Sequence, residues 1–345
     1  IQGADAGKVF MTDSYKGEQL GMLIQVPAKA GPFDLGLINV RAAVHVNKRT
    51  AQLRVISDPI PQILEGIPLR TKDIRVLVNR DDFTIAPTDC DPMAVEAEVQ
   101  GSHGATANLS NRFQVGECAS LGFNPKLRLD FGKSRKNTKR NAHPELNAKL
   151  SFNEGDSNIS SVEVALPQGV FLDQARLGRI CSRANYAAET CPEESRVGYA
   201  KATTPLLDNP VEGPVYLKAS DNVLPDLAAD LNGQIDIDLF GMIDQKENKK
   251  GLNQIRNTFD VVPDVPVSDF QLTLDGGSDG LLVNSRNICR TKRSQRLSIR
   301  MSAPYPTTRM CWQMPLRPVR VRRSAARSAG FSATPAGVWP RWGGS

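Results

Sequence analysis

The sequence predicts a mainly β protein with two consecutive antiparallel β-sandwich domains, immunoglobulin-like or similar, one short helix and an irregular C-terminal tail. Short runs of alternating apolar and polar residues, regularly spaced turn residues and little helical periodicity favour this class. The 345 residues are 40% hydrophobic, which is enough for two domain cores. No apolar run is long enough to span a membrane, so we expect a soluble protein without a membrane span.

The first domain is expected over residues 1–123. Its clearest hairpin joins residues 40–46 (VRAAVHV) to residues 51–55 through the polar segment 47–50, with the alternation of a half-buried strand pair. A second hairpin is predicted from residues 95–99 and 105–115 across a Gly-Ser-His-Gly turn. Further strand-like runs cover residues 20–26 and 74–78.

The second domain is expected over residues 124–290, with the boundary near residues 122–125. Its strand-like runs cover residues 127–131, 146–152, 162–166, 235–239 and 270–274. A helix is predicted over residues 172–182 (LDQARLGRICS), whereas residues 226–231 form at most one helical turn. Residues 132–143 are expected to be a solvated basic hairpin tip and residues 244–251 a second polar loop.

Residues 291–345 form a basic tail that differs from the rest of the chain. They contain ten Arg, one Lys and all three Trp but no Asp or Glu. The body therefore has a net charge of −5, although the whole chain has a net charge of +6. An arm for nucleic acid, built on Arg317, Arg320, Arg322, Arg323 and Arg327, is one interpretation. The others are a disordered end and a frameshifted end, and we favour the frameshift because of the cysteines.

The six cysteines indicate an exported protein. No CxxC motif or zinc-type His/Cys spacing is present, so disulfides explain them better than a metal. We predict the bridges Cys90–Cys118 and Cys181–Cys191. Cys289 is left beside Cys311, which lies in the anomalous tail, so we do not predict that pair. Because the chain opens on Ile1 without a secretion signal, any signal peptide is expected to lie outside it.

Several stretches resemble a family of uncharacterised, secreted, repeat-containing proteins from actinobacteria and related GC-rich bacteria. They include VPAKAGPFDLGLINVRAAVHVNKRTAQLRVISDPIPQILEGIPLR from residue 26, TDCDPMAVEAEVQGSHGATANLSNRFQVGECASLGFNPKL from residue 88, ANYAAETCPEESRVGYAKATTPLLDNPVEGPVYLKAS from residue 184, FDVVPDVPVSDFQLTLDGG from residue 259 and NSRNIC from residue 284. The resemblance implies an exported, mostly β protein of unknown activity. The family pattern stops after about Arg290, which would leave Cys289 without its usual partner.

Residues 276–280 (GGSDG) match the G-x-S-x-G pattern of a hydrolase nucleophile elbow. An elbow leads into a helix and is followed by the catalytic His. Here residues 281–283 look like a strand, and His45, His103 and His143 all precede Ser278. We therefore interpret this segment as a Gly-rich turn, and no catalytic or cofactor-binding residue is predicted.

Carboxylate pairs are the remaining candidates for chemistry. Asp275 with Asp279, Asp89 with Asp91 and Asp236 with Asp238 lack the spacing of a calcium loop. The last pair alternates with apolar residues and is expected on the wet face of a strand. No metal ligand is predicted. Among metals, a calcium ion bound at the surface agrees best with the sequence.

We therefore expect a non-catalytic, exported structural or adhesive module of a larger extracellular or cell-surface protein. Its expected partners are other domains of that protein or cell-envelope components, and nucleic acid is not expected. The alternative is an extracellular domain that binds a carbohydrate or hydrolyses a substrate at a site built from distant residues. A deep polar pocket with converging carboxylates would favour this alternative, and flat faces with small grooves would favour the structural module.

Overall fold

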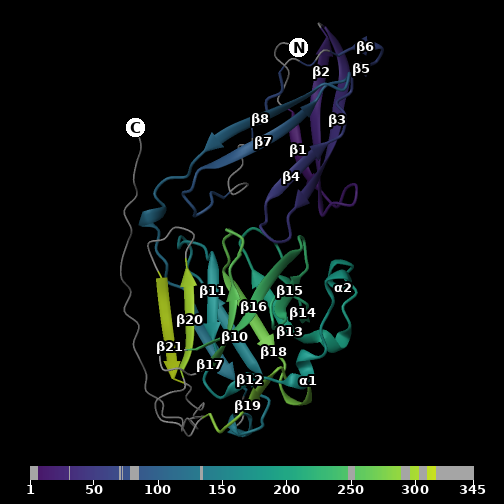
Figure 1. The fold of residues 1–345 in the computed structure, drawn as a ribbon. Helices are drawn as coiled ribbons and strands as arrows, with labels where there is room; N and C mark the ends of the chain where they lie inside the picture. The colour runs from purple at the N-terminus through teal and green to yellow at the C-terminus, as the bar shows by residue number, and fades with distance from the viewer. Residues whose placement is uncertain are drawn as a thin grey trace, which may run out of the picture.

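The computed structural model describes residues 7–30, 32–69, 71, 73–77, 85–132, 135–247, 253–288, 296–302 and 309–315. These residues form antiparallel β-sheets with two short α-helices, so the expected mainly β class is present. The strands divide into a small N-terminal group and one large sheet that begins at Lys126. The N-terminal group lies beyond one end of the large sheet (Figure 1).

The N-terminal group is a four-stranded sheet followed by two separate hairpins. The sheet consists of β1 (Lys8–Thr12), β2 (Leu20–Ala30), β3 (Phe33–Val46) and β4 (Leu53–Ser57), in that order. The hairpins are β5 (Ile63–Leu64) with β6 (Ile67–Pro68) and β7 (Met93–Gln100) with β8 (Thr106–Phe113). Residues 73–77 form no strand, in contrast to the expectation for 74–78, because no described strand pairs with them.

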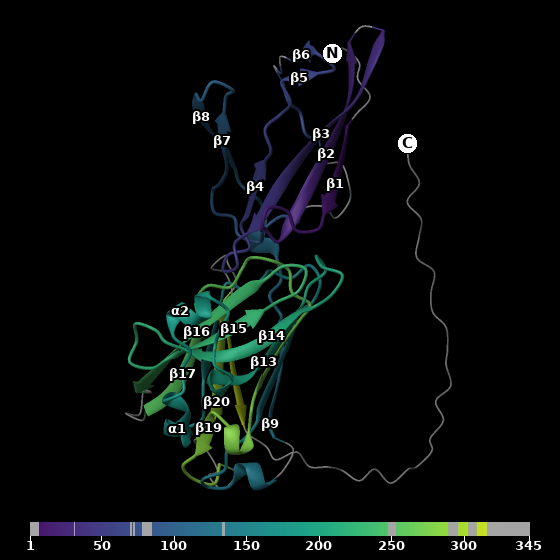
Figure 2. The same ribbon diagram turned by 90° about the vertical axis from the view of Figure 1, so that its right-hand side faces the viewer.

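The β7/β8 hairpin is amphipathic but stands apart from the four-stranded sheet (Figure 2). Its register places Val95, Val99 and Leu109 on one face and Glu96 and Glu98 on the other. The side chains of Val95, Val99 and Leu109 are all exposed. The described residues therefore do not confirm the expected sandwich of residues 1–123, since the apolar face of the β7/β8 hairpin is exposed.

The large sheet contains eleven antiparallel strands. It curls on itself (Figure 2), and apolar side chains such as Leu217 and Leu231 are buried in the core that it forms. One hydrogen-bonded sheet thus replaces the two facing sheets expected for the second domain. Its strands, in spatial order, are β21 (Arg309–Pro315), β20 (Arg296–Ser302), β11 (Ser161–Ala165), β17 (Asn253–Phe259), β16 (Ile237–Glu247), β15 (Asp226–Leu231), β14 (Val211–Lys218), β13 (Arg196–Thr203), β18 (Asp269–Leu274), β10 (Leu146–Ser151) and β9 (Lys126–Phe131).

Glycines allow neighbouring strands to come close where the sheet curls. A Cβ atom added to Gly198 of β13 would lie 2.1 Å from the carbonyl oxygen of Thr273 on β18. A Cβ atom added to Gly213 of β14 would lie 1.9 Å from the carbonyl oxygen of Asp230. The register between β13 and β14 also shifts between Arg196 and Gly198. Glycines and bulges of this kind give a sheet its curvature.

Three local predictions in or beside the large sheet are wrong. Residues 244–247, expected in a polar loop, belong to β16, and residues 248–251 lie outside the described part. Residues 226–231 form β15 rather than a helical turn, and Leu227, Ala228 and Ala229 are all buried. Burial on both faces hides the alternation that marks a half-exposed strand. The helix expected over residues 172–182 is present only as α1 (Gln174–Leu177), and α2 (Arg183–Ala187) begins after its expected end. The expected helix breaks because the backbone N–H of Cys181 donates to the carbonyl of Leu217 and joins the sheet.

Part of the tail expected to be irregular forms strands β20 and β21. Their register pairs Leu297 with Met314 and Ile299 with Trp312, and β20 also pairs with β11. A period of two is present in these short stretches, although the Arg-rich composition of the tail obscures it. The arginines proposed as a nucleic-acid arm and Cys289 lie outside the described residues.

The far end of the curled sheet is closed by a small strand pair. It consists of β12 (Val170–Leu172) and β19 (Leu282–Asn284). Leu281 and Leu282 are each 1% exposed. Beneath this floor, the connection between β9 and β10 contains the 3-10 helix η2 (Arg135–Thr138). The basic tip expected over residues 132–143 is therefore a hairpin connection, with residues 133 and 134 outside the described part.

Candidate functional site

The curled sheet encloses an apolar cavity of about 800 Å³. Its wall comes from strands that lie far apart in the sequence. Leu127 and Leu129 belong to β9, Leu272 to β18, Leu239 to β16 and Ile255 to β17. A cavity of this size lies within the range of small-molecule sites, about 300–1,000 Å³.

Register explains why the cavity wall is apolar. Across β10 and β18, Leu146 pairs with Leu274, and Ala148 pairs with Leu272. Since alternate residues of a strand share a face, these pairs all lie on the concave side, whereas Lys149 lies on the other side. The alternation recognised as a half-buried strand in the sequence thus forms the lining of a cavity.

The cavity is open at the end that faces the N-terminal group. The lining residues exposed at this end come from three strand connections: Asn153, Glu154 and Gly155 after β10, Pro205 and Leu206 after β13, and Ser268 before β18. Ala51 of the β3–β4 turn, together with Ile85, Ala86 and Thr88, also lines this end. We call this end the mouth.

A carboxylate fastens the segment over the mouth to the large sheet. Asp264 accepts hydrogen bonds from the backbone N–H groups of Thr88 (2.9 Å) and Asp89 (3.1 Å). It also accepts bonds from the Thr88 hydroxyl (2.8 Å) and the side-chain amide of Asn158 (2.8 Å). Hydrogen bonds to a charged group are among the stronger ones in proteins. We call this group the mouth clamp.

The predicted bridges Cys90–Cys118 and Cys181–Cys191 are both present, with Cα–Cα distances of 5.9 Å and 5.2 Å. The first joins the two ends of the β7/β8 hairpin next to the mouth clamp. The second closes the segment that contains α2. Both bridges therefore fix segments outside the cavity wall.

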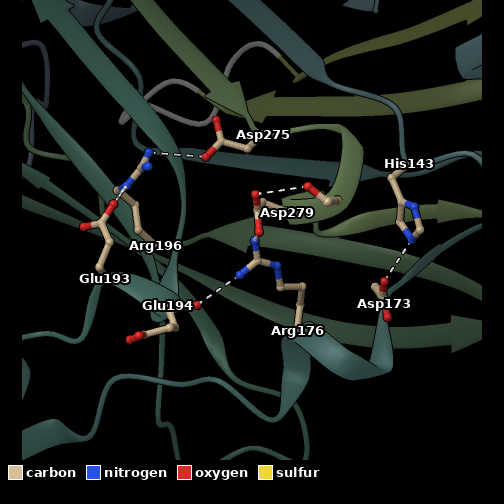
Figure 3. A network of polar contacts seen from close by, with 9 residues as sticks. His143, Asp173, Arg176, Glu193, Glu194, Arg196, Asp275 and Asp279 are labelled. Atoms are coloured by element: carbon tan, nitrogen blue, oxygen red, sulfur yellow. Dashed lines mark hydrogen bonds and ion pairs between the residues drawn. The ribbon is translucent and has the colours of Figure 1, made fainter.

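A polar network lies at the floor end of the sheet (Figure 3). The guanidinium of Arg176, whose side chain is 8% exposed, contacts Asp279 at 2.6 Å and donates to the Glu194 carbonyl at 3.2 Å. Arg196 contacts Glu193 at 2.6 Å and Asp275 at 3.3 Å. These contacts border a hollow of about 560 Å³. These ion pairs connect the loops beneath the floor, and because the carboxylates of Asp279 and Glu193 are largely exposed, their pairs contribute little to stability.

The G-x-S-x-G segment belongs to this network. Residues Gly277–Asp279 form a 3-10 helix that leads into β19, the strand expected over residues 281–283. It is not the hairpin turn expected from the sequence, because β18 and β19 belong to different sheets. The Ser278 hydroxyl donates to Asp279 at 3.3 Å. His143 lies near this turn, but its Nε2 contacts Asp173 at 2.8 Å (Figure 3).

The other two histidines lie elsewhere. His45 Nδ1 contacts Glu18 at 2.7 Å, and His103 Nδ1 contacts Ser102 at 3.1 Å, each on a separate part of the N-terminal group. In the part of the chain that the structure describes, no group of three or more His, Cys, Asp or Glu side chains could hold a metal ion. The structure therefore does not bring the predicted carboxylate pairs together into a calcium site.

Asp236 and Asp238 lie at the start of β16, where it contacts the N-terminal group. The backbone N–H of Asp238 donates to the Lys48 carbonyl at 2.8 Å, and its carboxylate accepts from the Tyr186 hydroxyl at 2.7 Å. Asp230 lies directly opposite Asp238 on β15. Burial raises the pKa of both carboxyls, and the charge of Asp238 raises the pKa of Asp230 further. The strand face that was expected to be exposed to solvent is thus partly buried.

The sequence argument did not find the mouth clamp or the cavity. Asp264 lies between Pro263 and Val265 in a loop, without a motif around it. The cavity depends on a sheet that curls around its apolar face instead of packing on a second sheet. The available signals were Gly198 and Gly213 inside strands, since such glycines indicate bulges or close backbone contacts.

No protein-family model, no curated protein and no solved structure matches the chain. In the described residues, no helix is long and apolar enough to cross a membrane. We therefore infer the function from the chemistry of the cavity and its mouth.

Proposed function

We propose that the protein is an exported, non-catalytic binding module that holds an apolar ligand inside the curled sheet. The observation that carries this proposal is the apolar cavity of about 800 Å³ with an open mouth. An apolar chain transferred from water into such a cavity gains about 0.8 kcal/mol for each buried CH₂ group. A carbohydrate is disfavoured, because its hydroxyls would find few hydrogen-bond partners along the wall.

Export is supported by the two disulfides, which form and persist in oxidising compartments. The protein would then act outside the cell or on the cell surface, and its partners would be other domains of a parent protein or cell-envelope components. The Cys90–Cys118 bridge lies next to the mouth clamp, so oxidation would help to keep the mouth assembled. Reduction is expected to weaken ligand binding for this reason.

Binding of an uncharged fluorescent apolar probe, N-phenyl-1-naphthylamine, tests this proposal. We expect saturable binding at one site and a blue-shifted emission. Leu129→Lys places a charge in the cavity wall and should weaken binding about tenfold or more. The matched control is Arg128→Leu on the same strand, because Arg128 is exposed and alternates with Leu129. Lack of saturable binding, or equal binding by both variants, would contradict the proposal.

A structural or adhesive role is the second candidate. It is favoured by the apolar face of the β7/β8 hairpin, where Val95, Val99, Leu109 and Phe113 are 62%, 51%, 58% and 43% exposed. An isolated two-stranded hairpin is marginally stable in water, so contact with another surface would stabilise it. Sedimentation velocity of the Leu109→Asp variant tests this role: loss of self-association supports it, and unchanged monomers in both proteins contradict it.

A further inference from the structure

The cavity lining carries charge of one sign. Among the described residues that line it there is no Lys, Arg or His, and the charged residues are Glu154 and Asp156. Both lie in the connection between β10 and β11, at the mouth. An amphiphile that buries its chain in the cavity would therefore place its head group beside two carboxylates.

The two carboxylates differ in the number of hydrogen bonds that they accept within the protein. Asp156 accepts hydrogen bonds from the backbone N–H of Asn124 (3.1 Å) and the side-chain amide of Asn153 (2.9 Å). Glu154 is exposed and has no polar partner among the described residues. Glu154 is thus the carboxylate that remains available to a ligand.

Uncharged polar groups complete the rim of the mouth. The Asn153 amide oxygen accepts no bond from any described residue, and the Thr204 hydroxyl accepts one from the backbone N–H of Leu206 (3.2 Å) and keeps its own proton to donate. Ser151 at the end of β10 and Thr203 at the end of β13 both pair with Asp269 of β18. The loops that follow β10 and β13 therefore lie two strand spacings apart, about 10 Å. The available groups are therefore mainly acceptors, which suit ligand hydroxyls.

An anionic head group does not fit this rim. A carboxylate or phosphate would find no cation among the lining residues and would lie near Glu154 and Asp156. Taking an ion out of water without a partner is costly, and like charges add to that cost. Several hydroxyl groups can instead donate to Glu154 and Asn153 and accept from Thr204.

We infer that the ligand is an amphiphile with an apolar chain and an uncharged head group that bears several hydroxyls. This inference rests on the proposed function, because it names the ligand class of the same cavity. The chain occupies the apolar wall, and the hydroxyls bind at the rim formed by Asn153, Glu154 and Thr204.

Competition among amphiphiles of equal chain length tests the inference. Monomyristoylglycerol, myristate and tetradecyltrimethylammonium would each displace N-phenyl-1-naphthylamine from the full chain at neutral pH, below their micellar concentrations. We expect monomyristoylglycerol to bind about tenfold more tightly than myristate. Myristate binding as tightly, or the ammonium amphiphile binding more tightly than the glyceride, would overturn the inference.

Variants at the rim separate charge from shape. Glu154→Gln keeps a hydrogen-bond acceptor and should reduce the preference for monomyristoylglycerol over myristate. Glu154→Lys should reverse this preference. The matched control is Glu96→Lys on the polar face of the β7/β8 hairpin, which makes the same charge change away from the mouth. An unchanged preference in Glu154→Lys would overturn the role of the rim. If the probe itself does not bind, the proposed function fails rather than the choice of head group.

Discussion

At the scale of single residues, Asp264 joins the two halves of the chain through several hydrogen bonds. Four donors from Thr88, Asp89 and Asn158 converge on its carboxylate. If Asp264 is removed, these donors lose their acceptor. A buried donor without a partner destabilises the folded state by more than one hydrogen bond stabilises it. The position of the segment over the mouth therefore depends on Asp264 together with Thr88, whose hydroxyl also accepts from the backbone N–H of Asn158.

Asp264→Ala is expected to lower the free energy of unfolding by roughly 2–4 kcal/mol. Urea denaturation followed by circular dichroism measures this loss, and limited proteolysis near residues 85–91 should become faster. Asp260→Ala in the same loop is the control, since Asp260 is exposed. Equal stability of the two variants would show that the mouth clamp does not join the halves.

The facing carboxylates Asp230 and Asp238 give a pH-dependent prediction. Because burial and the charge of Asp238 raise the pKa of Asp230 above its ordinary value of 3.8, the folded protein binds this proton more tightly than the unfolded chain. Stability therefore falls as pH rises from the ordinary pKa through the raised one, and the loss is complete above it.

Asp230→Asn is expected to stabilise the protein by roughly 0.5–1 kcal/mol at neutral pH. Below the ordinary pKa, where Asp230 is protonated in both states, the gain should disappear. Urea midpoints measured across this pH range test the prediction, with Asp226→Asn on the same strand as the control. A gain that persists unchanged in acid would indicate a cause other than charge.

At the scale of elements, the alternation of apolar and polar residues predicted most strands. It did not predict what their apolar faces would contact. The predicted hairpins of residues 40–55 and 95–115 are present as β3/β4 and β7/β8, because their polar and apolar positions alternate clearly. β15 was missed since both its faces are buried. Alternation reports which residues share a face, whereas tertiary contacts decide whether that face meets another sheet or lines a cavity.

The glycines that permit the curl give an element-scale prediction. Gly213→Ala would place a Cβ atom against the backbone of β15, so we expect a loss of roughly 1–3 kcal/mol and weaker probe binding. Gly116→Ala is the control, because nothing lies within 4 Å of its added Cβ atom. Thermal melting compares the two variants. Equal melting temperatures would mean that β14 and β15 do not approach closely at this point.

At the scale of the whole molecule, apolar side chains are packed differently in its two parts. The large sheet buries Leu217, Leu231 and Leu282 almost completely. In the N-terminal group, Leu53, Val55 and many other large apolar side chains are exposed. The sequence could not distinguish these parts, because both have the same strand-like alternation and their difference arises from contacts between distant strands.

The Cys90–Cys118 bridge is expected to stabilise the junction between these parts. It closes a segment with a sequence separation of 28 residues, for which the chain-entropy model gives about 3.5 kcal/mol. The Cys90→Ser/Cys118→Ser variant should lose up to this amount and expose the β7/β8 hairpin to protease before the large sheet unfolds. Cys181→Ser/Cys191→Ser, with a separation of 10 residues, should leave that hairpin protected. The same cleavage pattern in both variants would contradict this role of the bridge.

Methyl NMR of the protein titrated with monomyristoylglycerol tests most directly whether the cavity of the large sheet is the binding site. We predict intermolecular NOEs from the ligand chain to the methyl groups of Leu129, Ile255 and Leu272, with little change at Val95 and Leu109. NOEs confined to Val95 and Leu109 would contradict the account, because they would place the apolar ligand on the exposed hairpin.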